Sequence, residues 1–417
     1  RQYRLFLAGK MSVHPFCRIF QAVRALFLRI CRKAPPRTLS GEGCLGELPS
    51  LLEKKGIRRP LLLTTAGTLR RGAAEPFLSG CREKGIPVSV FDAVTPDPTE
   101  EEVLLGEARY REDCCDALVA LGGGSVLDCA KAVGARLARP GKPLIKMCGV
   151  LRVRRRLPLL FAVPTTAGTG SEVTAAAVLT FRDEKTGAHK KAAVSDFCLI
   201  PKVAVLDPAL TATLPPLRTA ECGMDALTHA IEAYTNRFAS SYVKKTAEKA
   251  VSLIFKNLPA AVKNPADPVA GAAMLSAAYL SGLAFTNNFV GTVHALAHAV
   301  GGLYGVPHGR ACAVLLVPVF RAYGKPAERK LAALSRAAGI SGKKTPAPAA
   351  AEAFLSEIEK RNRSFGIPAV FPELRPEDFG EIISRAQKET FPAYPVPVFL
   401  DRNALFHILT LVCPAVS

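Results

Sequence analysis

Residues 117–131 read ALVALGGGSVLDCAK, and this stretch decides the fold. Its first five residues are apolar, as in a buried strand, and three glycines separate them from a helix-like run. Glycines at such a turn let the backbone approach a ligand closely, and the following helix offers free N–H groups to a phosphate. The motif is neither GxGxxG nor a P-loop, so a simple tight turn is the alternative interpretation.

A second loop of the same kind follows the apolar run 159–163. Residues 164–174 read PTTAGTGSEVT, which places four threonines and two glycines at the end of a predicted strand. Small hydroxyl donors on a flexible backbone suit phosphate or ribose oxygens, although a threonine-rich capping turn is the alternative. Two such loops after neighbouring strands favour a binding site.

The surrounding pattern extends this into a fold class. Short apolar strands are predicted at residues 60–64, 86–91, 117–121 and 159–163, with helical segments between them. This alternation is typical of a parallel sheet covered by helices on both faces. The pattern ends near Pro215-Pro216, and almost every later segment reads as helix. We therefore predict an α/β domain with a parallel sheet over residues 37–215, followed by an all-α domain over 216–417.

The helical half carries a cluster of metal-ligand residue types. Asp225 and His229 are four residues apart, as are His294 and His298, and His308 follows in a Pro-His-Gly sequence. Residues four apart share one face of a helix. A carboxylate and several imidazoles suit a divalent ion such as Fe(II) or Zn(II). The alternative is a set of unrelated histidines in a helical core.

Residues 1–36 form a separate N-terminal extension. From Phe16 to Ile30, apolar residues recur at helical spacing with arginines between them, which predicts a basic amphipathic helix. Such a helix can make peripheral contact with an anionic membrane through residues 11–34, or pack on the protein body or a partner subunit. Packing is the favoured interpretation. Residues before Met11 are expected to have no folded role.

Composition excludes several classes of protein. The net charge of +20 over 417 residues suits anionic ligands, but no nucleic-acid-binding motif is present, so no nucleic-acid partner is expected. Twelve cysteines without a Cys-x-x-Cys pair indicate reduced thiols and a cytoplasmic protein. No apolar run is expected to reach the roughly 18 residues that span a bilayer.

Together these motifs resemble the iron-containing (group III) alcohol dehydrogenase family. The strings GGGSVLDCAK, PTTAGTGSEVT, DPALTATLP, GMDALTHAIEAY and VHALAHAVGGLYGVPHG occur in the family's order, and the resemblance covers roughly residues 38–400. It implies a dinucleotide-binding α/β domain, an all-helical metal-binding domain and usually a homodimer. The implied reaction moves a hydride between NAD or NADP and a small alcohol or aldehyde whose oxygen is held by Fe(II) or Zn(II).

The resemblance also assigns residues to roles. It implies metal ligands at Asp225, His229, His294 and His308. His298 matches a histidine near the nicotinamide, with a proton-relay or an orienting role, and Phe285 falls in the substrate pocket. The implied cofactor residues are Gly123, Gly124, Ser125, Asp128, Thr165, Thr166, Thr169, Lys191 and Thr211 to Leu214, with Pro96 to Thr99 near the adenosine.

One position departs from the family pattern. Members that prefer NAD usually carry an Asp after the first strand, where this chain has Thr65 in a Thr64-Thr65 pair. Without that carboxylate the repulsion of a 2′-phosphate is lost, and Arg70 and Arg71 can add positive charge. An NADP(H) preference or relaxed choice is therefore one hypothesis, and weaker use of NAD is the other.

Two other functions stay open from the sequence. A glycerol dehydrogenase-like enzyme has the same kind of metal site, although the GMDALTHAIEAY and PHG segments favour the alcohol dehydrogenases. A non-catalytic, membrane-associated NAD(P)-binding protein would use the basic helix as its anchor. The sequence does not indicate which alcohol is the substrate.

Overall fold

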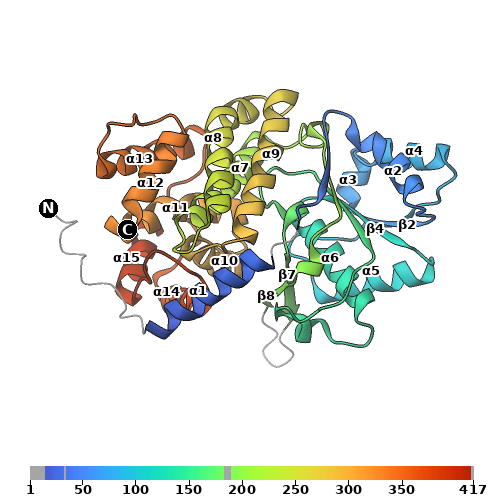
Figure 1. The fold of residues 1–417 in the computed structure, drawn as a ribbon, viewed down its shortest axis with the longest axis horizontal. Helices are drawn as coiled ribbons and strands as arrows, with labels where there is room; N and C mark the ends of the chain where they lie inside the picture. The colour runs from blue at the N-terminus through green and yellow to red at the C-terminus, as the bar shows by residue number, and fades with distance from the viewer. Residues whose placement is uncertain (1–14, 32–33, 183–188, 415–417) are drawn as a thin grey trace. The chain divides into compact units, whose positions relative to one another are not determined.

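A computed structural model describes residues 15–31, 34–182 and 189–414 of the chain (Figure 1). It divides into two compact units. The α/β unit comprises Lys33–Leu214 and Asn264–Gly282, and the helical unit comprises the chain to Arg32, Pro215–Lys263 and the chain from Leu283. Residues 1–14, including the stretch before Met11, lie outside the described residues. The segment 264–282 joins the α/β unit although it lies beyond the predicted boundary at residue 215.

The α/β unit is built on a parallel sheet. Within the described residues this sheet has six strands in the order β1-β9-β6-β4-β2-β3, all pairs parallel. The strands are β1 (Arg37–Ser40), β2 (Pro60–Leu63), β3 (Ser89–Phe91), β4 (Ala117–Gly122), β6 (Leu159–Pro164) and β9 (Val203–Leu206). A smaller sheet has the order β5-β8-β7, with strands β5 (Gly149–Val150), β7 (Ala176–Arg182) and β8 (His189–Ser195).

The strand sequences explain why the sheet is covered on both faces. Successive side chains of a strand point to opposite faces. Leu118 and Ala120 of β4 join one buried core, while Val119 and Leu121 join the other. The first core also takes side chains from α6, and the second from α2 and α4. The helices of this unit are α2 (Leu48–Lys54), α3 (Ala66–Arg70), α4 (Glu75–Glu83), α5 (Glu100–Glu112) and α6 (Gly124–Ala138).

The predicted fold class is confirmed, and each predicted strand is present. Three of these strands match within one residue at either end. The strand predicted at 86–91 is shorter, starting at Ser89, and Pro87 before it has no N–H to donate to a ladder. Strands β1, β5, β7, β8 and β9 were not predicted. β1, β5 and β9 have four residues or fewer, which is too short to show a period, whereas the seven-residue strands β7 (AAVLTFR) and β8 (HKKAAVS) do not alternate between apolar and polar residues.

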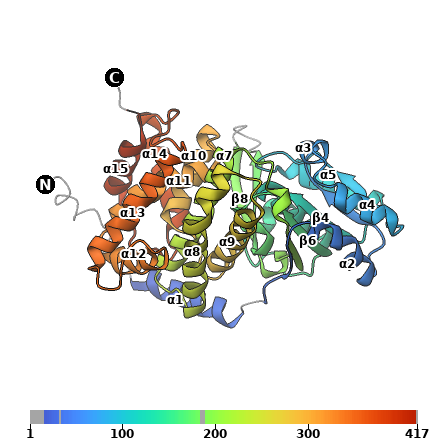
Figure 2. The same cartoon turned by 90° about the horizontal axis from the view of Figure 1, so that it is seen from above.

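The rest of the chain is helical (Figure 2). Its helices are α1 (Pro15–Ile30), α7 (Pro216–Thr235), α8 (Ser241–Lys263), α9 (Pro268–Thr286), α10 (Thr292–Tyr304), α11 (His308–Tyr323), α12 (Lys325–Ala337), α13 (Ala347–Ser364), α14 (Phe379–Thr390) and α15 (Arg402–Val412). Helix α9 corrects one expectation: it has 19 residues and a mean hydropathy of 1.5, enough by length and composition to cross a membrane. Half of it is buried, and a core helix rich in alanine passes the same test.

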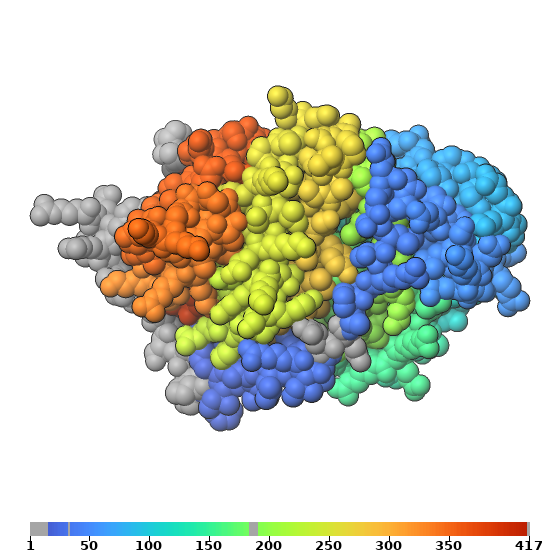
Figure 3. Space-filling model, turned by 45° about the horizontal axis from the view of Figure 1, so that its top comes forward, coloured from blue at the N-terminus to red at the C-terminus, as the bar shows by residue number. Residues whose placement is uncertain are grey.

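Helix α1 packs on the helical unit, but not through its apolar stripe. Gln21 and Ala25 are buried, and Gln21 donates to the carbonyl oxygens of Pro392 and Tyr394 at 2.8 and 2.9 Å. Arg18 and Arg24 donate to two further carbonyls of the 392–396 segment. The carbonyl oxygens of the 392–396 segment need hydrogen-bond donors, so the polar face of α1 packs against this segment. Helix α1 is the dark blue segment at the bottom of Figure 3. Its apolar stripe is exposed, and Phe16 and Ile30 are 73% and 75% exposed.

Candidate functional site

The helical unit positions a cluster of acidic and imidazole side chains, beginning on α7. Asp225, His229 and Glu232 lie at positions i, i+4 and i+7, so they occupy one face of this helix. All three are at most 5% exposed. A face of this kind, carrying two carboxylates and an imidazole in the interior, requires compensating donors or a cation.

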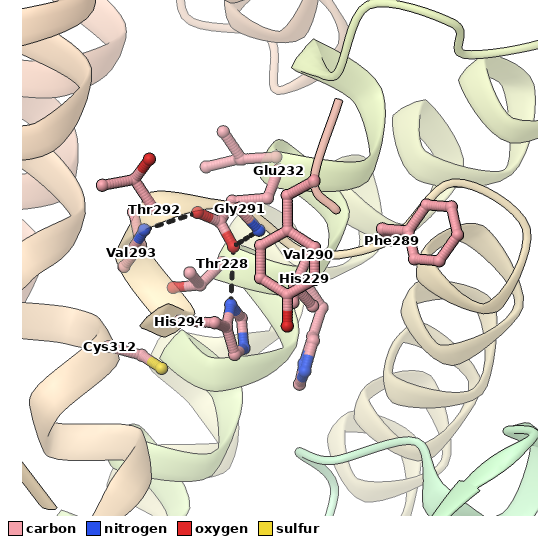
Figure 4. A network of polar contacts seen from close by, with 12 residues as sticks. Thr228, His229, Glu232, Phe289, Val290, Gly291, Thr292, Val293, His294 and Cys312 are labelled. Atoms are coloured by element: carbon pink, nitrogen blue, oxygen red, sulfur yellow. Dashed lines mark hydrogen bonds and ion pairs between the residues drawn. The ribbon is translucent and has the colours of Figure 1, made fainter. Parts of the chain in front are cut away.

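The buried carboxylate of Glu232 is compensated by hydrogen-bond donors of the segment that starts α10 (Figure 4). Its carboxylate accepts from the backbone N–H of Gly291 and of Val293, each at 2.7 Å, and from Nδ1 of His294 at 2.6 Å. Gly291 is the N-cap residue of α10, and it has no side chain that could cap this helix. The carboxylate from α7 therefore caps α10 and fixes the orientation of the His294 ring, leaving Nε2 directed at Asp225.

A glycine allows α11, the third helix of the site, to approach α7 closely. A Cβ on Gly309 would lie only 2.3 Å from the carbonyl oxygen of Glu221, so the start of α11 approaches α7 only with glycine there. His308 immediately precedes it, and its Nε2 lies 3.5 Å from Oδ1 of Asp225. The glycine of the Pro-His-Gly sequence is thus explained by close packing of two helices.

The donor atoms of three helices converge on Asp225. Its Oδ1 lies 3.7 Å from Nδ1 of His229 and 3.6 Å from Nε2 of His294. Donors bound to one tetrahedral zinc ion are about 3.3–3.8 Å apart, given metal–ligand distances near 2.0–2.3 Å. Among the described residues, none of these three buried atoms has a hydrogen-bond partner. Buried polar atoms are normally satisfied, so this set fits a divalent cation.

The electrostatics of Asp225 and His229 favour the same chemistry. Burial by itself raises the pKa of Asp225, but the imidazoles of His229 and His308 hold it well below its usual range. Burial lowers the pKa of His229 well below its ordinary value. An ionised carboxylate beside a neutral imidazole is the protonation state that binds a metal ion.

His298 lies beside this set rather than within it. Its ring stacks on His308 with centroids 5.2 Å apart, and Nδ1 is 2.8 Å from Oε1 of Glu389. Glu389 also accepts from the hydroxyl of Tyr394 at 2.8 Å. Phe285, the predicted pocket residue, stacks on His229 with centroids 4.3 Å apart. The structure therefore gives His298 a carboxylate partner at one ring nitrogen.

The α/β unit brings the two predicted cofactor loops together. They follow the adjacent parallel strands β4 and β6, and Thr165 N–H donates to the carbonyl of Gly122 at 2.9 Å. A Cβ on Gly124 would lie 2.7 Å from Cγ2 of Thr169, so only glycine permits this approach. A Cβ on Gly123 would lie nearest to the side chain of Thr166. Ligands of open α/β sheets bind at this carboxyl edge.

The strand order also locates the topological switch point. From β2 the chain moves to β3 on one side, and from β4 to β6 and β9 on the other. Thr65 follows β2 and the Gly123–Ser125 loop follows β4, so both lie at the carboxyl edge where the order reverses. Thr65 caps α3, accepting from Thr68 N–H at 3.1 Å. A Cβ on Gly67 would lie 3.2 Å from Nη1 of Arg71 and 3.8 Å from Oγ1 of Thr65, so both groups flank Gly67.

The remaining predicted cofactor residues lie in the α/β unit with varied partners. The Asp128 carboxylate accepts from Oγ of Ser171 at 2.6 Å and from Val178 N–H at 2.9 Å, so it ties α6 to the second loop and β7. Lys191 pairs with Asp97 at 2.7 Å, which links two predicted cofactor segments. The Thr211 hydroxyl donates to the carbonyl of Pro208 at 2.9 Å, and Leu214 is half-buried.

Sequence reasoning missed two carboxylates of the site. Glu232 had a signal, because it follows Asp225 and His229 at the i+7 position of the same helical face. Glu389 had none, because 91 residues separate it from His298. Only the tertiary structure pairs these two residues.

The sequence matches known protein families over most of its length. Residues 35–208 match the family described as iron-containing alcohol dehydrogenase, and residues 219–409 match the C-terminal region of the Fe-containing alcohol dehydrogenase family. The NAD-dependent methanol dehydrogenase of Bacillus methanolicus is 37% identical over 343 residues, which are 82% of this chain and 88% of that protein.

Solved structures show the same similarity. A 1,3-propanediol oxidoreductase is 34% identical with a TM-score of 0.85, covering 90% of this chain and 98% of that one. The sulfoacetaldehyde reductase of Bifidobacterium kashiwanohense, solved in complex with NAD+, is 28% identical with a TM-score of 0.81, covering 92% and 98%. Both the α/β unit and the helical unit therefore have counterparts of known structure.

Proposed function

Because the chain belongs to the iron-containing alcohol dehydrogenase family and is a metal-dependent alcohol dehydrogenase, we propose which residues perform the reaction. Asp225, His229, His294 and His308 would hold the divalent ion, Fe(II) or Zn(II). The observation that carries this proposal is the convergence of donor atoms from three helices on one carboxylate. Three of these atoms, on Asp225, His229 and His294, are buried and have no hydrogen-bond partner among the described residues. The predicted glycine and threonine loops and Lys191 would hold the nicotinamide cofactor.

The protein's own groups orient the reactants and move the proton. When bound, the ion acts as a Lewis acid toward an alcohol or carbonyl oxygen, and the nicotinamide exchanges a hydride with the adjacent carbon. Glu389 holds Nδ1 of His298 at 2.8 Å, which leaves Nε2 available to take up or release the alcohol proton. Phe285 covers one face of His229 and would line the substrate pocket.

A substrate panel tests this function. Purified chain loaded with Fe(II) or Zn(II) should oxidise small primary alcohols with NAD or NADP and reduce the matching aldehydes. Methanol and 1,3-propanediol belong in the panel, because similar proteins are named for them. Glycerol tests the glycerol dehydrogenase-like alternative. Metal-loaded protein that turns over none of these substrates would support the non-catalytic alternative.

We further propose that the chain uses NADPH at least as well as NADH. Support comes from the Thr65 hydroxyl and the Arg71 guanidinium, which flank Gly67 at the carboxyl edge of the sheet. An arginine near this position accommodates a 2′-phosphate, and a carboxylate would repel it. A wild-type kcat/KM for NADH far above that for NADPH would contradict the proposal.

Thr65→Asp is expected to reverse this preference. Aspartate caps a helix as well as threonine does, so α3 should keep its start while the 2′-phosphate meets a negative charge. We expect kcat/KM with NADPH to fall at least about tenfold, which corresponds to about 1.4 kcal/mol, with NADH largely unaffected. Thr65→Ser keeps the hydroxyl and the cap and serves as the matched control. Equal losses with both cofactors would mean that Thr65 does not face the 2′ position.

We also propose that the protein is a homodimer, and that it is cytoplasmic with reduced thiols.

We propose in addition a peripheral membrane contact through residues 11–34. The contact is supported by the outward apolar stripe of α1, in which Ile19, Val23 and Leu26 are 55–60% exposed, and by the net charge of +20. The full chain should pellet together with vesicles rich in anionic lipid. Val23→Ser with Leu26→Ser should abolish pelleting, whereas Lys249→Ser on α8 should not. Pelleting that the α1 changes leave intact would exclude this surface.

A further inference from the structure

A thiol lies next to the proposed metal ligands and has no role in the function described so far. Cys312 lies one helical turn after His308 on α11, and the two share a face of this helix. It is fully buried, and its Sγ is 3.7 Å from Nε2 of His308. This Sγ and donor atoms of Asp225, His294 and His308 all lie within 4.8 Å of one another.

The Cys312–His308 separation is close to that of two donors on one ion. A thiolate and an imidazole bound to the same tetrahedral zinc ion lie about 3.5 Å apart, given a Zn–S distance near 2.3 Å and a Zn–N distance near 2.0 Å. The Cys312–His308 separation agrees with this value. Two atoms of the same group, Oδ1 of Asp225 and Nε2 of His294, are buried and lack a hydrogen-bond partner among the described residues. Cys312 is therefore one of several donor atoms that lie close together, and not an isolated thiol.

We propose that Cys312 is a further protein donor to this centre and increases the preference of its substrate-free form for Zn(II) over Fe(II). Carboxylate and imidazole donors alone accept many divalent ions, whereas a thiolate favours thiophilic ones. On metal binding the S–H proton passes to solvent, and a sulfur electron pair forms the metal–sulfur bond. The bond must be exchangeable, because a catalytic ion keeps one position for substrate. This inference rests on the proposed function for the location of the ion.

Cobalt spectroscopy and metal competition test the proposal on the full chain. Metal-free protein is loaded with Co(II), whose bond to a thiolate gives a near-ultraviolet charge-transfer band. Zn(II) and Fe(II) affinities are then measured under anaerobic conditions by competition with a chelator. The variants are Cys312→Ser and Cys312→Ala. Cys129→Ala removes an equally buried thiol from the α/β unit and serves as the control.

The wild type and Cys129→Ala should show the band, and both Cys312 variants should lack it. The ratio of Zn(II) to Fe(II) affinity should fall at least about tenfold in the Cys312 variants, because a donor is lost. Wild-type protein that binds Co(II) without the band would overturn the inference while leaving the metal enzyme intact. Wild-type protein that binds none of the three ions would instead refute the proposed function. Where a Cys312 variant fails to fold, absence of the band from the wild type still overturns the inference.

Discussion

Asp225→Asn is expected to empty the metal centre and to lower kcat/KM by about 10³-fold or more. Oδ1 of Asp225 lies 3.5–3.7 Å from a donor nitrogen of each of three imidazoles, so this carboxylate is the common point of the donor set. The neutral amide keeps the shape of the side chain but loses the charge that attracts a cation. Loss of about 4 kcal/mol of metal-derived stabilisation corresponds to about 10³-fold in rate.

Metal content and thermal unfolding check this outcome together with turnover. An ion that binds only the folded chain stabilises it by about 2.7 kcal/mol at a hundredfold excess over its Kd. Wild-type Tm should therefore rise when Zn(II) or Fe(II) is added, and the Tm of Asp225→Asn should not. Thr228→Ala is the matched control, because its buried hydroxyl donates only to the carbonyl of Met224 on the same helix. An asparagine variant that retains one ion per chain and full turnover would refute the metal mechanism.

Glu232→Gln should have the second largest effect, on stability and metal affinity together. The carboxylate accepts three hydrogen bonds in the interior, from Gly291, Val293 and His294. An amide must turn its NH2 group toward at least one of these donors, which leaves a buried clash of hydrogens. We expect the free energy of unfolding to fall by about 3 kcal/mol, because hydrogen bonds to charged groups are each worth about 1.5–3 kcal/mol.

Metal affinity should fall about 10- to 100-fold in this variant, because the His294 ring loses the partner that orients it. Denaturant unfolding of metal-free protein and chelator competition measure the two effects separately. Glu248→Gln on α8 provides the comparison, since Glu248 accepts one hydrogen bond, from the Tyr234 hydroxyl. It should change stability by less than about 1 kcal/mol, because the amide oxygen can still accept this single hydrogen bond. Wild-type metal affinity in Glu232→Gln would show that the carboxylate only caps α10.

The strands show how far the sequence alone could predict the fold. The four predicted strands are apolar runs flanked by helical patterns, so their type and approximate bounds were readable. Strand β9 is equally apolar and has four residues, like β2, yet it was not predicted. The segment 264–282 read as helix, yet its place in the α/β unit depends on long-range packing. A Cβ on Gly282 would lie 2.7 Å from the carbonyl oxygen of Gly170.

Helix α1 shows a different limit. Periodicity separated its apolar and polar faces correctly, because the helical repeat is a local property of the chain. It did not indicate which face packs, since this depends on the row of carbonyl oxygens at residues 392–396. Hydrogen bonds to these oxygens come from side chains more than 360 positions earlier in the sequence.

The sequence by itself determined the fold class, the order of the cofactor loops and the residue types of a metal site, because strand periodicity, glycine turns and i, i+4 spacing are local. Only the tertiary structure decided which side chains meet. It pairs Glu232 with His294 and Glu389 with His298, and it brings the Cys312 sulfur to the same donors as Asp225. These contacts join residues of different helices. Their distances depend on how closely the helices pack, which the spacing of residues along one helix does not specify.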